Sequence, residues 1–251
     1  MFICLLFVMG TSVKAAPAST TTMPIPNINV SINGDTANSP KQYVDNIKML
    51  ILLTVLTLLP SIIIMMTSFT RIIIVFGFLR NALGTQQTPP NQVLIGLSIF
   101  LTVFIMAPTY NEINKNAIQP YVNNTISQDQ AIEEGAKPLR QFMLKQTRQK
   151  DLKLFVDQAK LDGKVTKDNV PLYVVVPAFT ISELKTAFTI GFLLYVPFLI
   201  IDFVVSSVLM SMGMMMVPPV MISLPFKILL FVMVDGWYMI VSSLIKSFHV
   251  T

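Results

Sequence analysis

KMLILLTVLTLLPSIIIMMTSFTR, residues 48–71, contains no charged side chain between Lys48 and Arg71. A second uncharged stretch lies between Arg80 and Glu112. Each exceeds the roughly 20 apolar residues that an α-helix needs to cross the hydrocarbon core of a bilayer. The whole chain is 53% hydrophobic and 12% charged, whereas an ordinary soluble domain carries about 25% charged residues. These features argue against a soluble fold and predict an all-α integral membrane protein.

The two stretches form a predicted hydrophobic helical hairpin over residues 47–108. Residues 86–90, QQTPP, supply its turn, and Pro108 ends it because proline cannot continue a helix without kinking it. Arg71 and Arg80 lie on the extension of the first arm toward the tip, where a plain membrane helix would not carry them. Two interpretations stay open: contacts with a partner subunit, or anchors at the membrane interface.

Residues 187–251 form a second predicted hairpin, whose two apolar runs are separated by SMGMMM at 211–216. Asp202 lies inside the first run, and Lys227 and Asp235 lie inside the second. An isolated charge near the centre of a bilayer costs about 2.5 to 3.5 kcal/mol, so such side chains face a bundle interior, a cavity or a partner charge. We expect these three residues to form buried charge pairs, within or between subunits; a proton relay is the alternative.

Residues 109–186 between the hairpins are hydrophilic and predict a soluble helical segment. One amphipathic helix is indicated by apolar side chains at helical spacing, namely Leu152, Phe155, Val156 and Ala159. Asp162 and Gly163 supply a stop. The β-branched residues 174–176, bracketed by prolines, predict an extended return segment.

Phe142, Phe155 and Glu183 lie in or beside this soluble segment and are candidate subunit contacts, since aromatic side chains are enriched in the centres of interfaces. Packing within their own subunit is the alternative.

The amino-terminal region predicts export of the soluble segment to the periplasm. Residues 1–15 fit a signal peptide, because the apolar run is too short to span a bilayer and ends in small residues. Residues 16–46 predict a disordered periplasmic arm. If the mature amino terminus is translocated, the basic tip of the first hairpin faces the cytoplasm and residues 109–186 face the periplasm.

The composition excludes most kinds of chemistry. Cys4 and His249 are the single cysteine and the single histidine, so neither a transition-metal site nor a histidine-assisted nucleophile can be built within this chain. The sequence has no phosphate-binding loop of the G-x-x-x-x-G-K-[ST] type. The net charge of +5 is interleaved with acidic residues and forms no basic run. We therefore predict no enzyme activity, no cofactor, no metal and no nucleic-acid partner.

Six motifs resemble one family closely. The residues that carry the resemblance are SFTRIII at 68–74, FLRNALGTQQTPPNQVL at 78–94, ISELKTAF at 181–188, SMGMMMVPP at 211–219, SLPFK at 223–227 and DGW at 235–237. The chain looks like a member of the FliP family of flagellar export-gate proteins and its virulence-secretion relatives, over about residues 42–248.

The resemblance implies a core pore-forming subunit of the flagellar type III export gate, which passes unfolded flagellar proteins across the bacterial inner membrane. It implies several copies of this chain, with five as the expected number, assembled helically with FliQ and FliR beside FlhA and FlhB. The location is the flagellar basal body, with much of the mass toward the periplasm. The broken, charged helices agree with a wall packed by protein.

In the family, the residues that match Met214, Met215 and Met216 project into the pore as a gasket. Thioether side chains are flexible and polarizable, so a ring of them can seal the pore at rest and yield around a passing chain. Gly213 and the prolines after the triplet favour a loop here. Gap-filling methionines in a core are the alternative.

Two other functions compete with this one. A small-solute or ion transporter subunit also has broken helices with charges at mid-membrane, but it predicts internal repetition, and the two halves show no convincing match. An intramembrane enzyme would need a paired nucleophile and base, which the single histidine argues against.

Overall fold

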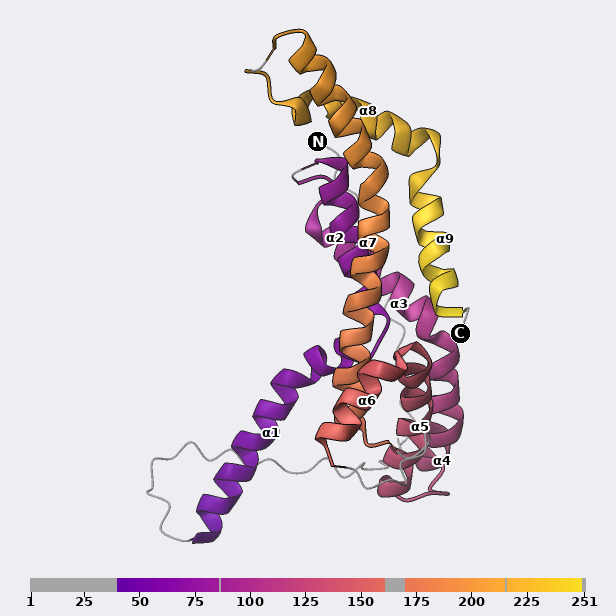
Figure 1. Cartoon of the computed structure of the whole chain (residues 1–251). Helices are drawn as coiled ribbons and strands as arrows, with labels where there is room; N and C mark the ends of the chain where they lie inside the picture. The colour runs from indigo at the N-terminus through magenta and orange to yellow at the C-terminus, as the bar shows by residue number, and fades with distance from the viewer. Residues whose placement is uncertain (1–39, 86, 161–169, 215, 250–251) are drawn as a thin grey trace, which may run out of the picture. The chain divides into compact units, whose positions relative to one another are not determined.

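Figure 1 shows the computed structural model, which describes residues 40–85, 87–160, 170–214 and 216–249. All regular secondary structure in these ranges is helical, so the predicted all-α fold is confirmed. The predicted signal peptide, nearly all of the predicted arm and the stop at Asp162 and Gly163 lie outside the described residues. Residues up to Leu50 and residues from Ile51 onward form two separate units. The described part of the first unit, residues 40–50, is helical.

The helices follow one another in the order α1 (Pro40–Met65), α2 (Phe69–Leu83), α3 (Asn91–Ile113), the π-helix η1 (Asn114–Ile118), α4 (Gln119–Val122), α5 (Gln128–Gln146), α6 (Gln149–Gln158), α7 (Leu172–Ser211), α8 (Pro219–Met233) and α9 (Gly236–His249). Within the described residues, three stretches are long and apolar enough to cross a membrane: Asn46–Met65, Asn91–Val122 and Leu172–Ser211. The pair α8 and α9, bent by 62°, makes a possible fourth span.

The first apolar stretch divides into two helices with different surroundings. From Ile51 to Met65, every side chain of α1 is exposed, and Pro60 lies within the helix without ending it. In α2, by contrast, Ile72, Val75 and Phe76 are fully buried. Helix α2 runs alongside α7 and lies at the centre of the main apolar core, to which α3, α7, α8 and α9 also contribute side chains. The first apolar stretch of the predicted hairpin therefore leads into two different helices: α1, which is exposed in this chain, and α2, which is buried in the core.

Helix α3 continues past the predicted end at Pro108, so that prediction was wrong. Pro108 lies inside α3, which passes directly into η1 and α4. A proline inside a helix removes one backbone hydrogen bond, and here the helix persists because α5 packs along α3 and η1. Gly135 of α5 permits that approach, since a side-chain carbon there would lie only 3.4 Å from Ala117 Cβ.

The predicted extended return at residues 174–176 was also wrong, because these residues lie in the first turns of α7. Val174 and Val175 are buried with Phe179 against Met143 of α5. Burial in this second apolar cluster overrides the weak preference of β-branched residues for strands. Helix α7 runs without a break through residues 186 and 187, so the soluble segment and the second hairpin share one helix.

Candidate functional site

The methionine turn, residues 211–218 from the end of α7 to the start of α8, carries exposed thioether side chains. Gly213 has a φ of 75°, and its N–H donates to Met210 O at 3.1 Å while Met214 N–H donates to Leu209 O at 3.0 Å. This bond pair ends α7 in a left-handed glycine, which needs no Cβ. Met214 is 42% and Met216 98% exposed; Met215 lies outside the described residues. The turn therefore leaves Met216 almost fully exposed and Met214 partly exposed.

Asp202 of α7 and Lys227 of α8 form an ion pair below this turn. Lys227 Nζ lies 2.6 Å from Asp202 Oδ2 and also donates to the Ala82 carbonyl oxygen of α2 at 3.1 Å. Ser223 Oγ donates to Asp202 Oδ1 at 2.5 Å. The Lys227 side chain is 3% exposed and that of Asp202 23%. The pair therefore satisfies both charges within one chain and fixes the α7–α8 hairpin to the end of α2.

Asp235 does not join that pair. It lies in the turn between α8 and α9 with a φ of 50°, and its side chain is exposed. It forms none of the ion pairs in the part of the chain that the structure describes. Gly236 follows because the Phe231 ring folds back against it: a Cβ there would lie 2.2 Å from Phe231 Cε2.

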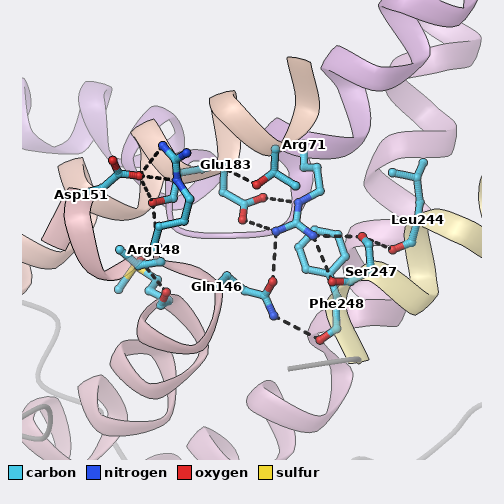
Figure 2. A network of polar contacts seen from close by, with 12 residues as sticks. Arg71, Gln146, Arg148, Asp151, Glu183, Leu244, Ser247 and Phe248 are labelled. Carbon is cyan, nitrogen blue, oxygen red and sulfur yellow. Dashed lines mark hydrogen bonds and ion pairs between the residues drawn. The ribbon is translucent and has the colours of Figure 1, made fainter. Parts of the chain in front are cut away.

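Arg71 and Glu183 form a second ion pair, buried between α2 and α7 (Figure 2). Arg71 Nε donates to Glu183 Oε2 at 2.8 Å, and Nη2 donates to Oε1, so the two planar groups face each other as a fork. Arg71 is 2% exposed and Glu183 0%. Both residues were candidate subunit contacts, yet the structure places them in contact with each other and gives Glu183 no surface for another subunit.

The remaining Arg71 donors hold the carboxyl end of α9. Nη1 donates to Ser247 O at 3.2 Å and to Ser247 Oγ at 2.9 Å, and the guanidinium lies 3.8 Å from the centre of the Phe248 ring. Gln146 of α5 accepts from Arg71 Nη2 at 3.0 Å and donates to Phe248 O at 3.2 Å. Cationic and amide donors thus satisfy carbonyls that the end of a helix leaves open. Four helices, α2, α5, α7 and α9, meet at this one guanidinium.

A third polar cluster, which the sequence did not reveal, joins α6 to α7. Asp151 Oδ2 accepts from Arg148 Nε at 2.8 Å and from Ser182 Oγ at 2.7 Å, and Ser182 Oγ accepts from Arg148 N–H at 3.1 Å. Burial alone would raise the pKa of the Asp151 carboxyl, but the hydrogen bonds from Ser182 and Arg148 and the Arg148 charge hold that pKa below its ordinary value. The i, i+3 spacing of Arg148 and Asp151 is the feature of the sequence from which this ion pair could have been predicted.

In three further predicted contact residues, part of the side chain stays exposed. The Phe142 ring packs 5.9 Å from Phe179 and 6.3 Å from Phe248, and Phe155 is half-buried in the Met143 cluster. Arg80 is half-buried and donates through Nη1 to Asn91 Oδ1.

The described residues contain no group of three or more His, Cys, Asp or Glu side chains that could hold a metal ion. One hollow, between α3, α5 and the end of α9, has polar lining residues that include Glu112, Gln141 and Lys145, whereas the others are largely apolar. A groove of about 500 Å³ runs between α7 and α8, and all of its lining residues are apolar: Ile200, Ile201, Val204, Val205, Val208, Leu209, Ile222 and Phe226. Such a surface can accept hydrophobic side chains or lipid but offers no polar group to a small solute.

Comparison with known proteins accords with this arrangement. Residues 52–244 match the sequence model of the FliP family. The chain is 59% identical over 221 residues to the flagellar biosynthetic protein FliP of Bacillus subtilis, an alignment that covers 88% of this chain and 100% of that protein. It is 51% identical over 244 residues to the FliP of Pectobacterium carotovorum, covering 97% and 90%, and 54% identical over 208 residues to that of Aquifex aeolicus, covering 82% and 87%. This chain therefore belongs to the FliP family and is a membrane-embedded component of the flagellar export apparatus.

Proposed function

We propose that this chain is a pore-forming subunit of the flagellar type III export gate, through which unfolded flagellar proteins cross the inner membrane. The observation that carries the proposal is the methionine turn, which leaves Met214 and Met216 exposed beyond the end of the α7–α8 hairpin. Copies arranged around an axis would bring these thioethers together in a ring. Such a ring excludes water at rest and deforms around an extended polypeptide, because the side chains are unbranched and polarizable.

We propose further that several copies, with five as the expected number, assemble with FliQ and FliR beside FlhA and FlhB in the basal body. The support is the amount of apolar surface that one chain leaves uncovered. The side chains of α1 from Ile51 to Met65 are exposed, and the α7–α8 groove is lined by apolar residues alone. Exposed apolar surface of this extent marks contact with protein or lipid. The soluble segment, residues 109–186, faces the periplasm in this arrangement.

Charge pairing does not itself require neighbouring subunits, which favours the first of the two alternatives from the sequence, pairing within one subunit. Asp202 with Lys227, and Arg71 with Glu183, satisfy each other inside one chain. Arg80, Phe142 and Phe155 remain the proposed subunit contacts because part of each side chain is still accessible. Arg71 and Glu183 would act on assembly indirectly, by fixing the helices that present these surfaces.

The internal pairing also disfavours the solute transporter. A transporter of this kind uses charges at mid-membrane to bind solute or a coupling ion. Here Lys227 Nζ is engaged by Asp202 and by the Ala82 carbonyl oxygen, and its side chain is only 3% exposed, so it is not open to a substrate.

Replacement of Met214, Met215 and Met216 by alanine tests the proposal. Ion leak across inner-membrane vesicles and secretion of a hook or filament protein are measured in the same strain. Leak should rise several-fold while secretion continues, because the seal is lost and the conduit stays open. The matched control is Met233→Ala, which removes an equally exposed methionine from α8 and should leave the leak unchanged. Leak equal to that of the unaltered chain in the triple variant would reject the seal.

A further inference from the structure

Exposed methionines are concentrated on one short part of the molecule. Five described residues between positions 210 and 221 expose 42% to 98% of their surface: Met210 (63%), Met212 (67%), Met214 (42%), Met216 (98%) and Met221 (69%). We call this set the methionine patch. Met143, by contrast, is fully buried at 0%. The patch therefore places five accessible thioether sulfurs at the end of one hairpin.

A thioether is the side chain that mild two-electron oxidants attack after thiols, and the one cysteine of this sequence, Cys4, lies far from the patch in the sequence. In hypochlorous acid the oxygen is electrophilic. A sulfur lone pair forms the new S–O bond, the O–Cl bond breaks, chlorine leaves as chloride and the hydroxyl proton goes to water. The products are methionine sulfoxide, chloride and a proton, so the step needs no other reactant.

We propose that the methionine patch is a reversible oxidation site at which sulfoxide formation makes the export conduit permeable to ions. The inference rests on the proposed function, since it takes the turn to be the seal. Oxidation replaces a flexible apolar group by a polar, chiral one. A sulfoxide oxygen accepts hydrogen bonds from water, so a ring of oxidised side chains would hold water where the thioethers excluded it.

The fold supplies a reason for selectivity beyond exposure. Met233 and Met239 are 76% and 54% exposed in the single chain, comparable to the patch. Both lie within the apolar helices α8 and α9, which together are long and apolar enough to cross a membrane. Lipid or a neighbouring subunit would shield them from a water-borne oxidant. Met212, Met214 and Met216 lie in the turn, after the Leu172–Ser211 span ends and before α8 begins at Pro219, so water in the conduit reaches them. Met210 and Met221 lie in the last turn of α7 and the first turn of α8, directly beside this turn.

The test uses the assembled export complex in inverted membrane vesicles, treated with hypochlorite at low molar excess. Peptide mass spectrometry locates the added oxygen, and an ion-sensitive dye follows the leak. Sulfoxide should appear first at the patch, with Met143, Met233 and Met239 unmodified, and leak should rise several-fold. The two stereospecific methionine sulfoxide reductases together, with dithiothreitol as the reductant that is oxidised to its disulfide, should reverse both changes. A variant with leucine at the five patch positions and at Met215 keeps an apolar seal and should not respond to oxidant.

The outcomes separate this inference from the proposed function. Oxidation spread evenly over Met233, Met239 and the patch would overturn the assignment of the site. If the patch is oxidised without added leak, while the Met214–216 alanine variant does leak, the oxidation inference falls and the seal stands. If neither the oxidised complex nor the alanine variant leaks, the proposed seal itself is wrong.

Discussion

Arg71 and Glu183, 112 positions apart in the sequence, meet in a buried ion pair in which Arg71 Nε donates to Glu183 Oε2 at 2.8 Å. The other two guanidinium nitrogens of Arg71 donate hydrogen bonds to Gln146 and Ser247. A single side chain of α2 thereby positions the last helix of the chain.

Removal of one partner of this pair should destabilise the protein strongly. Glu183→Gln leaves a buried guanidinium without its counter-charge, and loss of one partner of a buried pair costs about 3 to 5 kcal/mol. Thermal unfolding of the purified protein should occur at a clearly lower temperature, whereas Arg71→Met with Glu183→Leu should recover much of the loss. The control is Glu134→Gln, which removes one partner of an exposed, solvent-screened pair with Lys137 and should change stability far less. Equal melting temperatures for Glu183→Gln and the control would contradict the account.

Removal of either partner of the Asp202–Lys227 pair should also be harmful. Because this pair fixes the α7–α8 hairpin, its loss should also affect the methionine turn. Asp202→Asn and Lys227→Met each leave a charge without its partner, and each should reduce the amount of assembled complex on native gels. The double variant should assemble better than either single variant. Asp235→Asn is a matched control, since Asp235 is exposed and asparagine tolerates its positive φ. A double variant worse than both single variants would reject pairing as the role of these residues.

Gly191 sets the distance between α2 and α7. A Cβ at this position would lie 2.4 Å from Phe78 Cδ2 and 2.5 Å from Phe78 Cγ, so Gly191→Ala forces the ring or the helices apart. Overpacking of this kind costs about 1 to 3 kcal/mol. Gly96→Ala, in α3, meets no atom within 4 Å and should stabilise its helix by about 0.5 to 1 kcal/mol. Opposite shifts in the melting temperature are expected; a Gly191→Ala protein as stable as the unaltered chain would refute the close contact.

Asp151 makes the stability of the soluble segment depend on pH. Its pKa in the folded chain lies below the ordinary value of about 3.9, so the carboxylate adds stability above that value and the contribution is lost as pH falls through the folded pKa. Asp151→Asn should therefore lower the melting temperature at pH 6 and have little effect near the folded pKa. Asp157→Asn, an exposed carboxyl on the same helix, serves as the control. An Asp151→Asn penalty that grows as the pH falls would have the wrong sign.

Local pattern predicted much of this fold. The apolar runs gave the membrane-type helices, and the spacing of Leu152, Phe155 and Val156 gave α6 within a few residues. The two errors at prolines share one cause. Pro108 and Pro177 lie inside α3 and α7 because packing against α5 outweighs one missing backbone hydrogen bond, and that packing is invisible to a local pattern.

In the candidate site, the pairs between residues far apart in the sequence could not be predicted. The charges of Asp202 and Lys227, 25 positions apart, were near enough in a hairpin to suggest a pair. Arg71 and Glu183 lie in two different segments, and each alone resembled a surface contact. Only the approach of α2 to α7 brings them together, and that approach depends on the full tertiary fold rather than on either motif.

The most direct test of the central claim is to ask which side chains a passing substrate touches. A photo-cross-linking amino acid is placed at position 216, at position 143 or at position 233, in cells that hold a stalled export substrate. The account predicts a cross-link to the substrate from position 216, and none from the buried position 143 or the helical position 233. Substrate captured from position 233 but not from position 216 would show that the conduit does not pass the methionine turn.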